Sequence, residues 1–436
     1  MNTPCGSIST ALPDQESRTH VNRDRLCCWY LASPDEPRLV GEVRLEAGAR
    51  SCILTLDPEW QETGFDLTPD MPNLQRLHAP RGEQRAPGAL DDALPDRWGE
   101  RMIRVISRPS RMSPLDLLWY AGDRRFGALG ISSSADAYLP CEEPPLLQAS
   151  SIETAEGIIQ RVMAREPLTA RERELIASAG SLGGAHPKML VEQDGAEWIA
   201  KFPKGQNVDQ LLIEHASMEL ARRAGLTVAE SMVMRGGIDH VLLVRRFDRI
   251  GEGREHVASA RTLLVREGDD SYATISALLR RLTAPGEIEA QQRELFGRMA
   301  LNIMIDNTDD HTKNHAFLRR ADGTWGLTPA YDIPVQMNGL GAQAIQISPD
   351  PSRLNRFDRE HAAAAAPRFG MSPQEALAEW NRIAGHVARW REVFAEVGVT
   401  ERDIDYLADF LDSAEKREHR KDATLPPASG ADEGPR

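Results

Sequence analysis

The sequence lacks any long hydrophobic run. Its longest apolar stretches, such as Met299–Ile305, are far shorter than the ~20 residues that span a bilayer, and this one includes Asn302. The first twenty residues contain neither the basic segment nor the apolar core of a secretory signal. We therefore expect no secretory leader here, no membrane association and a cytoplasmic location.

Cysteine is scarce and unevenly placed. The five cysteines all lie in the first third of the chain, two of them are adjacent, and no Cys-x-x-Cys pair occurs. An odd number without paired spacing disfavours both a disulfide framework and a zinc ribbon. The pattern fits a protein of the reducing cytosol.

Positive charge is also in short supply. Lysine and arginine total 52 against 66 aspartate and glutamate, which gives a net charge of −14 and a pI of about 5.4. Such a balance disfavours general binding to nucleic acid, whose phosphates require a basic surface. The 41% apolar and 27% charged content is that of a globular protein with its own core.

The 436 residues suggest two to four domains, at roughly 100–200 residues each. Pro- and Gly-rich stretches and changes of composition divide the chain. The predicted parts are a disordered arm (1–25), a β-rich N-terminal subdomain (26–145), a mixed lobe with a Gly-rich loop (151–250), a helical lobe (251–414) and a disordered tail (415–436).

Apolar periodicity predicts the main elements of these parts. Short apolar runs over Cys27–Leu56 indicate a strand meander, and an Asp-Gly pair between two later runs is a strong hairpin signal. In the helical lobe, Leu295, Met299 and Ile303 share one face of a helix. Ser372-Pro373 is typical of a helix start, and we expect that helix to run to about Glu396.

The sharpest chemical signal is the polar segment Asn307–Asn314, which directly follows an apolar helix. Asp309 and Asn314 stand five residues apart, the spacing that joins the base to a magnesium ligand in protein-kinase catalytic loops. His311 lies between them. A structural histidine that hydrogen-bonds the loop backbone is favoured there over a base or a metal ligand, and we count His311 among the residues of the nucleotide site.

A second carboxylate, Asp332, follows the predicted strand Trp325–Leu327. A kinase places the aspartate that joins Mg²⁺ to the phosphates just after a strand, downstream of the catalytic loop. Magnesium prefers oxygen ligands, and one or two side chains plus substrate phosphates suffice. Asn314 and Asp332 are therefore the predicted magnesium ligands.

Two upstream features fit the same chemistry. Lys201 closes the second hairpin strand, as the phosphate-binding lysine of kinases does, and Glu214 in the next helix is its natural partner. The Gly-rich loop, Ala179–Lys188, precedes the first hairpin strand, and its residues Gly183, Gly184 and Ala185 would bring backbone amides to phosphate oxygens. A P-loop ATPase is disfavoured because its Gly-x-x-x-x-Gly-Lys-Ser/Thr motif is missing.

Each of these pieces is common in proteins that bind no nucleotide. A lysine that closes a strand is usually a solvated charge, and a Gly-rich segment is usually only a turn. The order of the four pieces along the chain is that of a kinase, which is much harder to explain by accident.

At these residues the sequence resembles the HipA family of toxin kinases from bacterial toxin–antitoxin systems. The resemblance covers about residues 26–400. The matching segments are SLGGAHPK (181–188), IAKFP (199–203), IEHASMELAR (213–222), LLVRRFDR (242–249), NTDDHTKNHAFL (307–318) and LTPAYDI (327–333), with weaker matches at ALPDRWG (93–99) and DRRFGALG (123–130).

The resemblance implies an α+β, two-lobed protein-kinase-like fold with an added N-terminal β-rich subdomain and a helical C-terminal lobe. It implies protein serine/threonine kinase activity with ATP and Mg²⁺, with Asp309 as base and Lys201 on the phosphates. By position, Leu243, Arg245 and Phe247 would lie in the adenine hinge, although Arg245 stands where the family has an acidic residue. Ser181 stands at the position that members autophosphorylate.

The same resemblance implies partners and a role. Known members act on aminoacyl-tRNA synthetases and so inhibit translation, and a small helix-turn-helix antitoxin neutralises them and represses the operon. No helix-turn-helix is evident in this chain, so we expect DNA contact chiefly through the antitoxin. Two alternatives remain: a small-molecule kinase on the same scaffold, and a catalytically silent module that only binds an antitoxin.

Overall fold

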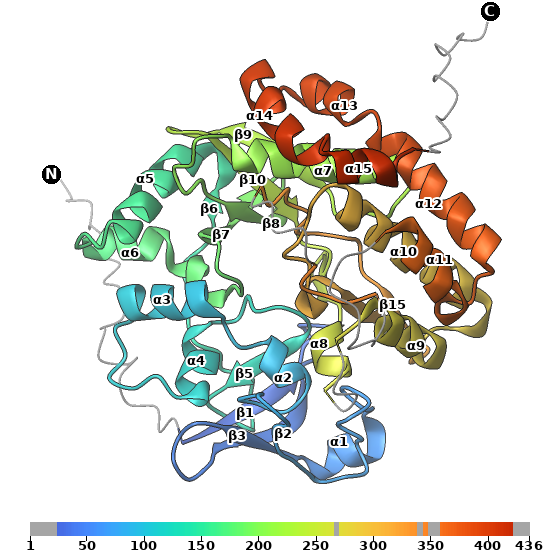
Figure 1. Cartoon of the computed structure of the whole chain (residues 1–436). Coiled ribbons are helices and arrows are strands. Elements are labelled where there is room, and N and C mark those ends of the chain that lie inside the picture. The colour runs from blue at the N-terminus through green and yellow to red at the C-terminus, as the bar shows by residue number, and fades with distance from the viewer. Residues whose placement is uncertain (1–23, 266–269, 338–342, 348–357, 422–436) are drawn as a thin grey trace, which may run out of the picture.

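The computed structural model describes residues 24–265, 270–337, 343–347 and 358–421 (Figure 1). The predicted arm lies almost entirely outside the described residues, as does the tail from residue 422 onward. In the described part no helix combines the length and the apolar character that a membrane span needs. The chain folds into an N-terminal module and two lobes, which together surround the candidate site.

The N-terminal module is built on a five-stranded antiparallel sheet in the order β4-β3-β2-β1-β5. Its strands are β1 (Arg25–Tyr30), β2 (Arg38–Leu45), β3 (Cys52–Leu56), β4 (Leu77–His78) and β5 (Leu129–Ser132). The predicted meander over Cys27–Leu56 is confirmed. Four helices complete the module: α1 (Pro58–Thr63), α2 (Ala89–Asp92), α3 (Arg97–Ile106) and α4 (Pro114–Tyr120). Of these, α3 turns toward the first lobe.

The first lobe has a second sheet, in the order β6-β7-β8-β10-β9. Its strands are β6 (Leu147–Gln148), β7 (Lys188–Gln193), β8 (Ala196–Lys201), β9 (Ser231–Arg235) and β10 (His240–Arg245). Side chains alternate between the two faces of a strand. Leu242 and Val244 accordingly pack into the core around α7 (Gln210–Arg223), whereas Val241 and Leu243 pack with α5 (Ile152–Met163).

The second lobe is helical and is centred on α10 (Ile288–Met304), which packs between α9 (Tyr272–Leu282) and α12 (Pro373–Val387). A three-stranded sheet, β13 (Val257–Ser259), β14 (Ala316–Arg319) and β15 (Trp325–Leu327), lies at the end of this lobe. The polar segment Asn307–Asn314 leaves the end of α10 and leads into β14. The buried helix is therefore the base on which that loop is fixed.

Two predicted boundaries in this lobe are wrong. The helix expected over 372–396 is broken after Ala388, and α13 (Trp390–Val397) takes a new direction because it packs on α7 while α12 packs on α10. The tail expected from residue 415 begins instead with α15 (Ala414–His419). The amine of Lys416 is buried in this helix, where it donates to Ile303 O at 2.6 Å and pairs with Asp306 at 3.3 Å.

Candidate active site

Lys201 lies at the centre of the site, between one partner from each lobe. Its amine is 2.6 Å from Glu214 Oε1 on α7 and 2.6 Å from Asp332 Oδ1 in the segment after β15. Lys201 itself is 6% exposed. The predicted pairing of Lys201 with Glu214 is confirmed, and the contact with Asp332 extends it across the two lobes.

The charges of Lys201, Glu214 and Asp332 depend on one another. Burial alone would lower the pKa of Lys201, but Asp332 and Glu214 outweigh it and hold the pKa above its usual value. Burial alone would raise the pKa of Asp332. The positive charges of Lys201 and, to a smaller extent, Lys188 outweigh burial and lower this pKa below its usual value, so the carboxylate is ionised at neutral pH. A lysine kept charged in a low-dielectric position is suited to bind an anion.

Asp332 is held in an uncommon backbone conformation. Its φ is +58°, in the left-handed region that non-glycine residues seldom adopt. The preceding Ala330 exchanges hydrogen bonds with the chain beside α7, from its amide to Thr227 O at 2.8 Å and from Ala229 N to its carbonyl at 2.9 Å. Strain that neighbouring hydrogen bonds maintain is typical of functional positions.

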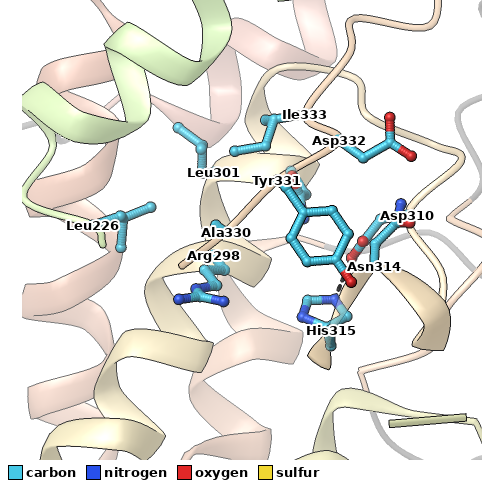
Figure 2. Close-up of a pocket in the computed structure, with 11 residues that line it drawn as sticks. Leu226, Arg298, Leu301, Asp310, Asn314, His315, Ala330, Tyr331, Asp332 and Ile333 are labelled. Atoms are coloured by element: carbon cyan, nitrogen blue, oxygen red, sulfur yellow. Dashed lines mark hydrogen bonds and ion pairs between the residues drawn. The ribbon is translucent and has the colours of Figure 1, made fainter. Parts of the chain in front are cut away.

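The segment Asn307–Asn314, predicted from its spacing to be the catalytic loop and called so below, has outward and inward side chains. Asp309 and His311 are exposed, whereas Asp310, Thr312 and Asn314 are buried. Figure 2 shows Asn314, Asp310 and Asp332 around the same pocket. The loop thus offers Asp309 to solvent and turns Asn314 toward the segment that carries Asp332.

The inward side of this loop is fixed by a buried polar network. Asp310 Oδ2 accepts a hydrogen bond from the Tyr272 hydroxyl and lies 2.9 Å from His315 Nε2. Asn302 on α10 donates to the same hydroxyl at 3.2 Å. Burial would raise the pKa of Asp310, but His315 and the Tyr272 hydroxyl hold it below its usual value. The sequence reasoning missed these side chains as supports of the loop.

The structural role predicted for His311 is wrong. Its ring is exposed and makes no hydrogen bond to the backbone of the described loop; only its carbonyl does, accepting from Asn314 N at 2.8 Å. A positive charge on this ring would add to the lowering of the pKa of Asp310 and of Asp332, as the smallest of the contributions to each. The backbone hydrogen bond from Asn314 N to the His311 carbonyl closes the turn, in place of the ring contact that was expected.

The Gly-rich loop is open at its centre. Gly183 and Ala185 are exposed, and Gly184 is half-buried with a φ of +86° that favours glycine. A Cβ on Gly184 would lie 2.7 Å from the amine of Lys188. Burial and then the charge of Lys201 lower the pKa of Lys188 to about 8. Lys188 is thus a further cation beside the site, one to which sequence reasoning assigned no role.

Ser181 lies at the closed end of the same loop. It ends the 3-10 turn Ala177–Ser181, is 6% exposed, and its Oγ donates to Ser178 O at 2.8 Å. In this conformation the hydroxyl completes a turn. Any reaction at Ser181 therefore requires the loop to leave its present position.

The three residues expected in the adenine hinge lie at the end of β10 but in different surroundings. Leu243 is fully buried in the sheet core, and Arg245 is exposed and pairs with Glu230 at 2.8 Å. Phe247 is half-buried between two aromatic rings, with centroids 6.1 Å from Phe126 and 5.5 Å from Tyr331. The segment is therefore supported from the N-terminal module and from the residue before Asp332.

The side chains present suit a hard cation bound together with phosphates. The pairing with Lys201 uses Oδ1 of Asp332, and the Asn314 side chain adds an amide oxygen at the same pocket. Among the described residues no three His, Cys, Asp or Glu side chains gather into a metal centre of their own. This donor set matches magnesium, which binds through one or two side chains and substrate phosphates.

Comparison with known proteins agrees with this arrangement. Residues 36–132 match the model of the HipA N-terminal domain, and residues 180–391 match that of the HipA-like C-terminal domain. The chain belongs to the HipA family. It is 24% identical over 395 residues to the serine/threonine-protein kinase toxin HipA of Shewanella oneidensis, covering 80% of this chain and 85% of that protein.

The fold of this HipA-family chain is similar to that of HipA in the Shewanella oneidensis MR-1 complex of HipA, HipB and operator DNA. The TM-score is 0.63 at 20% identity, and the match covers 91% of this chain and 96% of the other. The predicted α+β, two-lobed kinase-like fold is confirmed. The chain is a kinase of the HipA serine/threonine kinase toxin family.

Proposed function

We propose that the protein transfers the γ-phosphoryl group of ATP to a serine or threonine hydroxyl of a protein. The observation that carries this proposal is the position of Lys201, whose amine lies 2.6 Å from a carboxylate of each lobe. Phosphoryl transfer depends mainly on positioning and on charge compensation. A buried, charged lysine between the lobes provides both.

The proposed roles follow from the contacts that each residue makes and from its exposure. Lys201 would hold the phosphates and Asn314 and Asp332 would hold Mg²⁺. Asp309, whose side chain is exposed, would receive the incoming hydroxyl. Bound Mg²⁺ would supply compensation of the phosphate charge. The hydroxyl oxygen forms a bond to the γ-phosphorus, the bond from that phosphorus to ADP breaks, and the hydroxyl proton passes to Asp309.

The remaining residues would bind the nucleotide. Backbone amides at Gly183 and Ala185 are the proposed phosphate contacts, because both residues are exposed. Gly184 between them is proposed to shape the phosphate-binding turn through its positive φ, since its own amide donates to Asp96 Oδ2. His311 is exposed, like Asp309, and is proposed to reach the phosphates. The adenine would lie at the hinge formed by Leu243, Arg245 and Phe247.

We further propose that the chain is the toxin of a toxin–antitoxin pair in the cytoplasm. The support is its family and the relative whose structure was determined with HipB and operator DNA. The proposed partners are a helix-turn-helix antitoxin, through which DNA would be contacted, and a protein substrate such as an aminoacyl-tRNA synthetase. Phosphorylation of such a substrate would inhibit translation, and transfer to Ser181 would silence the enzyme.

One experiment separates this function from its two rivals. The purified protein is incubated with labelled ATP, Mg²⁺ and a cell lysate, and the labelled species are identified. Labelled protein supports the proposal, whereas label only in small molecules would favour the small-molecule kinase. A protein that binds an antitoxin but transfers no label to any acceptor would be the silent module.

A further inference from the structure

A turn of the N-terminal module lies along the whole Gly-rich loop. Trp98 N donates to Gly184 O at 3.0 Å, and the indole nitrogen of Trp98 donates to Lys188 O at 2.7 Å. A Cβ on Gly99 would lie 2.5 Å from Leu182 O, so the helix α3 touches the loop backbone directly. The module therefore contacts the loop backbone at Leu182, at Gly184 and at Lys188.

Asp96, at the start of this turn, connects the loop to the other lobe. Its Oδ2 accepts from Gly184 N at 3.0 Å, and its two oxygens lie 2.7 and 2.9 Å from the amine of Lys313 in the catalytic loop. A single carboxylate from the N-terminal module thus joins the Gly-rich loop to the catalytic loop, whose residues lie far away in the sequence.

The orientation of Asp96 is itself informative. Asp96 is the N-cap residue of α3, where an aspartate usually accepts from the first amides of its own helix. No such bond is present, because the side chain points to Gly184 and Lys313 instead. Burial alone would raise the pKa of Asp96, but Lys313 and the Gly184 amide hold it below its usual value.

We propose that Asp96 is a positioning residue of the phosphoryl-transfer site, which ties the Gly-rich loop to the catalytic loop and holds both in place for the nucleotide. The role rests on the function proposed above. Asp96 acts through Gly184 and Lys313 and takes no part in the transfer itself. Without the Asp96 carboxylate, the Gly184 amide and the Lys313 amine lose their shared partner. The two loops must then become ordered at the moment when the nucleotide binds.

The test compares Asp96→Ala and Asp96→Asn with Asp123→Asn. Asp123 is a matched control, because it also joins the N-terminal module to a later part of the chain, through Arg254 at 2.6 Å in the segment that follows the first lobe, without touching either loop. Hydrogen exchange without nucleotide should show the Gly184 amide exchanging about tenfold faster in Asp96→Ala, as expected for loss of a charge-assisted contact. Asp123→Asn should leave this amide unchanged.

Steady-state kinetics provides the second readout. The KM for Mg·ATP should rise about tenfold in Asp96→Asn and in Lys313→Met while kcat falls less, and the double variant should be no worse than either single one, since the two residues act as a unit. Unchanged exchange at Gly184, an equal KM, or the same changes in Asp123→Asn would overturn the role and leave the proposed function in place. A wild-type protein that never binds Mg·ATP would overturn the proposed function, and this role with it.

Discussion

The two loops that face each other across the site are stabilised in opposite ways. The buried side of the catalytic loop is fixed from within its own lobe, through the contacts of Asp310 with Tyr272 and His315, and Lys313 near its end also pairs with Asp96 of the N-terminal module. The centre of the Gly-rich loop is held from outside, by Asp96 and Trp98 of the N-terminal module, while its end also contacts its own lobe through His186, whose Nε2 lies 2.8 Å from Phe202 O. The support of the catalytic loop thus lies in the core of its own lobe, whereas the centre of the Gly-rich loop depends on a separate part of the chain.

This difference suggests how the protein could be controlled. A loop supported by core packing opens only when that core unfolds, while a loop supported by a neighbouring module can be released by moving the module. Ser181 lies at the boundary, buried in a 3-10 turn against which α3 packs. Moving the module away would therefore remove the packing of α3 against the turn that contains Ser181.

The largest effect is expected at the exposed side of the catalytic loop. Asp309→Asn should lower phosphoryl transfer by about 10²–10⁴-fold, because a positioned base contributes that much. Its melting temperature should stay close to that of the wild type, since the side chain is exposed. Transfer rates and melting curves are compared on the same samples; an active variant would show that the base lies elsewhere.

The next effect is expected on the buried side of the same loop. Asp310→Ala leaves the Tyr272 hydroxyl and the His315 ring without their shared partner, and we expect the free energy of unfolding to fall by about 3 kcal/mol. Denaturant titration measures this loss. A loss as small as that of Asp309→Asn would contradict the claim that the loop is fixed from within.

A smaller effect is expected for the outside support of the Gly-rich loop. In Gly99→Ala the new methyl would meet Leu182 O at 2.5 Å and Pro95 Cβ at 2.6 Å, so we expect a loss of about 1–3 kcal/mol and faster proteolysis at residues 181–186. The control is Gly157→Ala in α5, where nothing lies within 4 Å. Equal protease resistance in the two variants would mean that α3 does not hold the loop.

Local patterns were sufficient to predict much of this site. The hairpin, the following helix and the spacing from Lys201 to Glu214 are short-range features, and their ion pair is present in the structure. The contact of Asp96 with Lys313 joins residues 217 positions apart. No periodicity encodes such a contact, because it depends on how the N-terminal module is placed on the lobes.

The two wrong boundary predictions, for the helix over 372–396 and for the tail from residue 415, also arise from contacts between parts of the chain that are distant in sequence. The residues from 415 to 421 look like a solvated charged segment, but Lys416 donates to a carbonyl at the end of α10, and Trp380 donates to His419 O at 2.9 Å. The helix break after Ala388 is set by packing on α7 and α10, and the nearby Gly385 lies within α12 and does not end it. Tertiary contacts decide these boundaries against the local sequence preference.

The central claim is that Lys201 and Asp332 form one nucleotide site, and its most direct test is the binding of Mg·ATP to wild-type protein and to Lys201→Met. Thermal unfolding with increasing Mg·ATP measures it, because a ligand at 100 times its Kd stabilises a fold by about 2.7 kcal/mol. We predict a concentration-dependent rise in the melting temperature of the wild type and little or none in Lys201→Met. Equal shifts in both proteins, or none in the wild type, would contradict the account.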